Sequence, residues 1–131
     1  DFLKGLLAVW LASIMHFGPF IQGLVGLAAV LGHVYPVFFE FKGGKGVATT
    51  LGVLCGFQPM LGLIVVIVWM LVAYFSRYAS LASMVAVSIA PFLQFHGKSA
   101  FIPLLIIALI VLYQHRNNIT RLREGREPKI K

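Results

Sequence analysis

Charged residues divide the chain into long apolar runs. No formal charge occurs between Lys4 and Glu40, a run of 35 residues, or between Lys45 and Arg77, a run of 31 residues. At 1.5 Å per residue, these runs would form helices of about 50 Å and about 45 Å, whereas the hydrocarbon core of a bilayer is about 30 Å thick. Each run is therefore too long for one membrane-spanning helix and about right for two.

Glycine and proline interrupt both long runs near the middle, where a turn between two helices is needed. The first break is the Gly-Pro pair at 18–19, and the second is Gly-Phe-Gln-Pro at 56–59. The two shorter runs, 78–97 and 99–115, each have the length of one helix. The pattern predicts six spans, at about 3–16, 19–38, 46–57, 60–76, 80–95 and 100–114, followed by a tail at 115–131.

Composition places these helices in a membrane. Hydrophobic residues make up 60% of the chain, charged residues 11%, and the mean hydropathy is +0.92. A soluble protein carries about 25% charged residues, and a backbone in lipid must satisfy its own hydrogen bonds, so we expect an all-α, polytopic membrane bundle. Six spans put ten of the eleven Lys and Arg residues on one side and only Lys98 on the other, as expected of a cytoplasmic face. The chain opens on Asp1 and not on Met, and we expect that an N-terminal piece is missing.

The first candidate site is the glycine-rich segment before the third predicted helix. Backbone amides of a glycine turn, the positive end of a helix and a lysine together favour an anion, and phosphate above all. The spacing does not match a nucleotide-binding P-loop, and a plain basic loop that attracts anionic lipid headgroups is the alternative. The candidate phosphate ligands are the amides of Gly43, Gly44 and Gly46, the Lys45 ammonium and the Thr49 hydroxyl.

The second candidate site is the basic segment that follows the last predicted span. It contains histidine, asparagine and arginine, which can shuttle protons or donate hydrogen bonds to phosphate. A tail that merely anchors the chain to anionic lipid is the alternative. The segment lacks the aromatic residues that nucleic-acid binding needs, so that class is excluded. If the segment is helical, Gly125 should end the helix, and Glu127 is placed to brace the tail against Arg121 or Lys129.

His33 is a third candidate, because an imidazole inside a predicted span requires a partner. A substrate contact and a hydrogen-bonded structural histidine are equally compatible with the sequence.

Two long segments resemble signature motifs of a known family. Residues 32–49 (GHVYPVFFEFKGGKGVAT) and 115–129 (HRNNITRLREGREPK) are similar to the second and third motifs of the bacterial acyl-phosphate glycerol-3-phosphate acyltransferases, and 1–5 and 77–84 also match that family's pattern. The resemblance implies a seven-helix enzyme of the bacterial inner membrane, with its motifs facing the cytoplasm. Its first helix and first motif are absent here.

The resemblance also implies a reaction, the first step of phospholipid synthesis. A fatty acyl group passes from acyl-phosphate to the sn-1 hydroxyl of glycerol 3-phosphate and gives lysophosphatidate, with no metal, cofactor or protein partner. It assigns His115 and Asn118 to glycerol 3-phosphate and lets Arg116 add charge to the phosphate site. The predicted catalytic residues are His115, Asn118 and Lys45. The proton acceptor is either His115 or a phosphate oxygen of the substrate.

A non-catalytic transporter subunit or lipid-binding scaffold is the alternative function. A transporter of this kind would require charged residues at mid-membrane, whereas the formal charges of this chain lie in loops and at the ends of the predicted spans.

Overall fold

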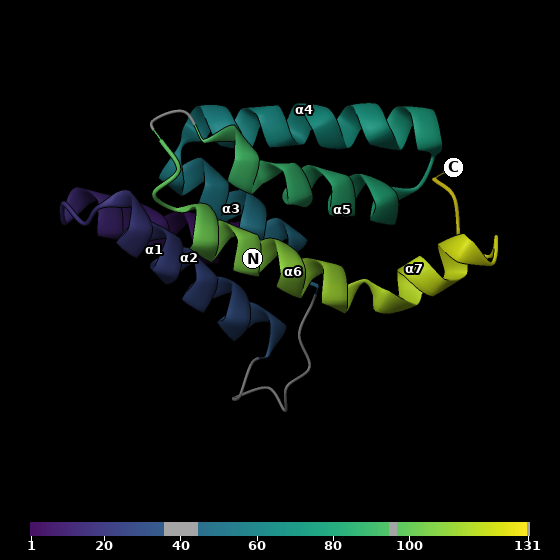
Figure 1. Cartoon of the computed structure of the whole chain (residues 1–131), viewed down its shortest axis with the longest axis horizontal. Helices are drawn as coiled ribbons and strands as arrows, with labels where there is room; N and C mark the ends of the chain where they lie inside the picture. Colours follow the sequence, from purple (N-terminus) through teal and green to yellow (C-terminus); the bar gives the residue numbers. More distant parts are fainter. Residues whose placement is uncertain (36–44, 95–96, 131) are drawn as a thin grey trace.

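The computed structural model describes residues 1–35, 45–94 and 97–130, and within these ranges it contains helices and turns but no strand. The helices pack into one bundle, with α7 and the C-terminal tail at the end where α4 turns into α5 (Figure 1). In chain order they are α1 (Phe2–Ile14), α2 (Pro19–Val34), α3 (Val47–Phe57), α4 (Pro59–Ser76), α5 (Ala79–Ile89), the 3₁₀ helix η2 (Ala90–Leu93), α6 (Phe101–Gln114) and α7 (Arg116–Arg123).

Prolines set several helix ends. Pro19 and Pro59 are the first residues of α2 and α4, where the missing proline N–H costs no hydrogen bond. The fifth predicted span, 80–95, is shorter as an α-helix than expected. It ends at Ile89 and continues as the 3₁₀ helix that contains Pro91, because a proline interrupts the α-helical hydrogen-bond pattern. The last part of the second predicted span, 36–38, lies outside the described residues.

Glycines allow α1 and α3 to pack backbone against backbone. A side chain on Gly52 would collide with the backbone carbonyl of Phe2, and one on Gly5 would collide with the carbonyl of Thr49. Small residues permit such close approach between helices in membrane proteins. The fully buried core between the helices is built from aliphatic side chains, including Val9, Val30, Val53, Leu54, Leu61, Ile107 and Val111.

Large apolar side chains also cover the outside of the bundle, including those of Trp10, Phe20, Leu71, Phe75 and Leu109. Within the described ranges, α4 is the one helix whose length and composition suffice to cross a bilayer by itself. The α6–α7 pair would be a second candidate span if its 58° bend is treated as a break within one span. Several other apolar helices are shorter than the 18 residues required of a candidate span. The number of spans therefore stays a prediction.

Candidate active site

Gly46 begins α3 in a conformation that only glycine adopts easily. Its φ is +92°, and an added Cβ would lie 3.2 Å from Val34 on α2 and 3.5 Å from Val111 on α6. Its carbonyl accepts hydrogen bonds from the backbone N–H of Thr50 at 2.9 Å and from the Thr50 hydroxyl at 2.5 Å. Gly46 thus packs the start of α3 between the ends of α2 and α6.

Lys45 lies immediately before this turn and reaches the first turn of α7. Its ammonium group donates a hydrogen bond to the side-chain oxygen of Asn118, which is buried. The two segments that the sequence marked as candidate anion sites therefore meet at one end of the bundle. This is the juxtaposition that the sequence interpretation required.

Glu127 holds Asn118 from the opposite side. The Asn118 amide donates to one Glu127 oxygen at 2.8 Å, and Nε of Arg121 donates to the other at 2.8 Å. Ser80, in the first turn of α5, also donates to the Glu127 carboxylate. The side chain of Glu127 is only 4% exposed, so this carboxylate joins α5, α7 and the tail from inside the protein.

These partners keep Glu127 ionised. Burial alone would raise the pKa of its carboxyl group. Hydrogen bonds from Ser80, Asn118 and Arg121, together with the charge of Arg121, outweigh burial and lower the pKa to about 2. Arg121 offsets the charge of Glu127, so the ammonium of Lys45 leaves this end of the bundle positive.

Gly125 ends α7, as the sequence predicted. The helix stops at Arg123, and Gly125 has a φ of +72°. The N–H of Arg126 bonds to the carbonyl of Arg121 at 2.8 Å, and the N–H of Gly125 bonds to that of Leu122 at 3.3 Å. This pair of bonds is a Schellman motif, and it turns the tail back toward α5.

The tail then runs along the α4–α5 turn. The backbone N–H of Ile130 donates to the Arg77 carbonyl at 2.7 Å, and the Arg77 guanidinium donates to the Ile130 carbonyl at 3.2 Å. Lys129 lies over the ring of Tyr78, 5.8 Å from its centre. Of the two partners expected for Glu127, the structure thus gives Arg121, and Lys129 contacts an aromatic ring instead.

His115 lies in the bend between α6 and α7 and is 4% exposed. Its Nδ1 is 2.8 Å from the Val111 carbonyl, which can only accept, so Nδ1 carries the proton and Nε2 keeps a lone pair. Burial lowers the pKa of His115; the Val111 bond and Glu127 oppose this effect, whereas the charge of Lys45 adds to it. A neutral imidazole with a free Nε2 can accept a hydrogen bond or a proton.

Three other predicted residues do not join the Lys45–Asn118 pair in this arrangement. Arg116 is exposed; it donates to the Tyr113 carbonyl at 3.1 Å, and its guanidinium carbon lies 4.5 Å above the centre of the Tyr113 ring. His33 lies with Nδ1 3.5 Å from the carboxylate of Asp1. Thr49 is fully buried, and its hydroxyl lacks a hydrogen-bond partner among the described residues. The predicted ligands Gly43 and Gly44 lie outside those residues.

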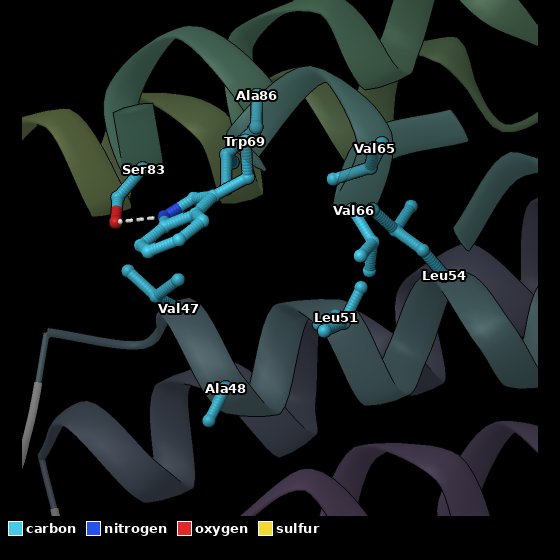
Figure 2. A pocket seen from close by; sticks show the side chains of 10 residues that line it. Val47, Ala48, Leu51, Leu54, Val65, Val66, Trp69, Ser83 and Ala86 are labelled. Atoms are coloured by element: carbon cyan, nitrogen blue, oxygen red, sulfur yellow. Dashed lines mark hydrogen bonds between the residues drawn. The ribbon is translucent and has the colours of Figure 1, made fainter. Parts of the chain in front are cut away.

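An apolar cavity of about 390 Å³ adjoins this site. Its lining begins at Val47, two residues after Lys45, and continues along α3 through Leu51 to Leu54. Helices α4 and α5 form the other walls. Trp69 on α4 and Ser83 on α5 lie together at the end of the cavity that Val47 also lines (Figure 2). The lining of this cavity suits a hydrocarbon chain, and it begins two residues after Lys45 in the chain.

Two site residues were missed by sequence reasoning. Ser80 precedes Glu127 by 47 positions, and the sequence analysis gave its hydroxyl no role of its own. The sequence also did not single out Trp69, although a tryptophan inside a predicted span needs an acceptor for its indole N–H, and that requirement is a usable signal.

Comparisons with known proteins identify the family of this chain. A family model described as glycerol-3-phosphate acyltransferase matches residues 1–125. The glycerol-3-phosphate acyltransferase of Legionella pneumophila (strain Corby) is 50% identical over 134 residues, which cover 100% of this chain and 48% of that protein. That of Francisella philomiragia is 48% identical over 132 residues, covering 99% of this chain and 65% of that protein.

A solved structure is similar along the whole chain. PlsY, described as an integral membrane glycerol 3-phosphate acyltransferase and crystallised in glycerol 3-phosphate and lysophosphatidic acid forms, is 41% identical with a TM-score of 0.92. In the glycerol 3-phosphate form the match covers 100% of this chain and 68% of PlsY. The chain thus spans about half the length of the Legionella relative. The family model covers nearly the whole chain, and the chain therefore belongs to the glycerol-3-phosphate acyltransferase family.

Proposed function

We propose that this chain forms the core of an enzyme that transfers a fatty acyl group from acyl-phosphate to the sn-1 hydroxyl of glycerol 3-phosphate. The observation that carries the proposal is the position of the Lys45–Asn118 pair beside the apolar cavity that begins at Val47. Such a site suits a ligand with an anionic head and a hydrocarbon tail. The acyl donor and the lysophosphatidate product both have this form.

Each predicted residue receives a role in this scheme. Lys45 binds phosphate together with the backbone amides of Gly43, Gly44 and Gly46, at the positive end of α3. Asn118 and His115 bind glycerol 3-phosphate, with Asn118 held in place by Glu127. Further phosphate contacts are assigned to Arg116, His33 and the unpartnered hydroxyl of Thr49; Arg116 and His33 would have to leave their present partners.

The chemistry requires positioning more than activation, because acyl-phosphate is already a reactive mixed anhydride. The sn-1 oxygen forms a bond to the acyl carbonyl carbon, and the bond from that carbon to the phosphate oxygen breaks. Lys45 stabilises the negative charge on the departing phosphate. The hydroxyl proton passes to a phosphate oxygen, and Nε2 of His115 serves as a hydrogen-bond acceptor that orients the hydroxyl. The products are lysophosphatidate and inorganic phosphate.

We place this reaction on the cytoplasmic side of the bacterial inner membrane, as the first step of phospholipid synthesis. The excess of Lys and Arg on one predicted face, the apolar outer surface of the bundle and the integral membrane description of PlsY support this placement. Six spans in this chain and seven in the complete protein remain part of the proposal.

The test uses the complete protein that carries this chain, purified in detergent. It is incubated with glycerol 3-phosphate and either palmitoyl-phosphate or palmitoyl-CoA. We expect lysophosphatidate and an equal amount of inorganic phosphate from the acyl-phosphate alone. Transfer from the CoA thioester alone would contradict the proposal that acyl-phosphate is the acyl donor. Binding of both substrates without turnover would favour a lipid-binding scaffold.

A further inference from the structure

The apolar cavity contains one hydrogen-bonded pair in its wall. The indole N–H of Trp69 on α4 donates to the hydroxyl of Ser83 on α5 at 2.9 Å (Figure 2). The Ser83 hydroxyl in turn donates to the Ala79 carbonyl at 2.9 Å. The other side chains lining the cavity are aliphatic. The indole N–H and the Ser83 hydroxyl proton are therefore both already engaged, and the pair offers no free hydrogen-bond donor to the cavity.

The pair lies at the end of the cavity that is nearest to the anion site. Helices α3 and α4 form a hairpin that turns at Gln58. Val47 lies eleven positions before Gln58 and Trp69 lies eleven positions after it, so the two residues are at the same height in the hairpin. Figure 2 shows Val47, Trp69 and Ser83 together at one end, with Leu54, Val65 and Val66 toward the other. An acyl chain whose phosphate is held at Lys45 would pass Trp69 with its first few carbons.

This arrangement has a consequence for the donor. A hydroxyl on the third carbon of the acyl chain would enter a region whose walls are the face of Trp69 and the methyl groups of Val47. The one serine hydroxyl there accepts from Trp69 and donates to Ala79. The oxygen of the donor hydroxyl would therefore be buried without an N–H or O–H to accept from, and an unsatisfied buried polar atom costs free energy equivalent to about 5- to 150-fold in affinity.

We propose that the Trp69–Ser83 pair makes this site select against acyl donors that are hydroxylated on the third carbon. Trp69 and Ser83 are thus specificity-determining residues, and they act by removing hydrogen-bonding capacity from the cavity wall. This inference rests on the proposed function, because it assumes that the cavity holds the acyl chain of the donor.

The test compares palmitoyl-phosphate with 3-hydroxypalmitoyl-phosphate, using the ratio of their kcat/KM values in the complete protein. The wild type should favour the unsubstituted donor by about tenfold or more. Trp69→Phe frees a second acceptor position on the Ser83 oxygen, and Ser83→Ala frees the indole N–H, so each variant should bring the ratio closer to one. The double variant removes both polar groups and should restore the preference of the wild type.

A matched control separates this effect from a change of cavity size. Val66→Ala enlarges the cavity without freeing a polar group, and its ratio should equal that of the wild type. The inference is overturned if the wild type uses both donors equally, or if neither single variant changes the ratio. It is also overturned if the double variant remains as permissive as the single variants, because the effect would then come from space alone. If the wild type does not acylate glycerol 3-phosphate from palmitoyl-phosphate, the proposed function itself fails.

Discussion

The ammonium group of Lys45 donates a hydrogen bond to the side-chain oxygen of Asn118, which lies 73 positions later in the chain. Glu127 accepts a hydrogen bond from the amide nitrogen of the same asparagine at 2.8 Å. Asn118 therefore connects a lysine proposed to bind substrate with a buried carboxylate that ties the tail to α5. The two neighbours of Asn118 should respond differently to substitution.

Removal of the Glu127 charge should destabilise the fold. Glu127→Gln loses the ion pair with Arg121 and directs an amide N–H at groups that are themselves donors. We expect the free energy of unfolding to fall by about 2 kcal/mol or more, measured by denaturant titration in detergent. The matched control is Glu124→Gln, which breaks an exposed pair with Arg126 and should cost about 1 kcal/mol or less. Equal stability of the two variants would contradict a structural role for Glu127.

Stability should also depend on pH through Glu127. Its pKa is about 2 in the folded protein and 4.5 in its ordinary state, so the unfolded chain takes up the proton first as the pH falls. The stabilisation is therefore present above about pH 4.5 and is lost as the pH falls from about 4.5 to about 2. The difference in unfolding free energy between wild type and Glu127→Gln should shrink from pH 6 to pH 3. A constant difference would show that the carboxylate charge is not responsible.

Much of the helical layout could be predicted from the sequence, because charges and Gly-Pro breaks are local signals. Helices α1, α3, α4 and α6 begin and end within two residues of the predicted bounds. Within the span predicted at 80–95, the α-helix ends at Ile89 and a 3₁₀ helix continues to Leu93; Pro91 indicates an interruption from sequence, but not which kind of helix follows it. Whether the helices span a membrane is not decided by their positions.

The candidate site could be predicted only in part. Residue chemistry identified Lys45, the family resemblance identified Asn118, and the structure brings the two together. The contact of Ser80 with Glu127 joins segments far apart in sequence, so no local pattern reveals it. Arg116 was assigned to phosphate from its charge, yet the ring of Tyr113, three positions earlier, provides a nearer partner. Which of two possible partners a side chain such as Arg116 contacts depends on side-chain geometry, which the sequence does not give.

Gly46 should be sensitive to the smallest substitution. Gly46→Ala forces a side chain into a φ of +92°, which costs about 1–2 kcal/mol, and pushes against Val34. Because Lys45 is the preceding residue and is assigned to the phosphate of the acyl donor, we expect the KM for acyl-phosphate to rise by about tenfold, with a smaller change in kcat. Gly32→Ala is the matched control: it adds a methyl group in open space on a helix and should leave the KM unchanged. An unchanged KM in Gly46→Ala would contradict the claim that this turn contributes to substrate binding.

The most direct test of the central claim is the turnover of Lys45→Ala in the complete protein, measured as lysophosphatidate formed from acyl-phosphate and glycerol 3-phosphate. The matched control is Lys98→Ala, which removes a lysine that bonds to the carbonyl of Phe92. We predict that Lys45→Ala remains folded but loses about a hundredfold or more in kcat/KM, whereas Lys98→Ala retains full activity. Near-normal turnover in a folded Lys45→Ala variant would contradict the assignment of this lysine to the reacting phosphate.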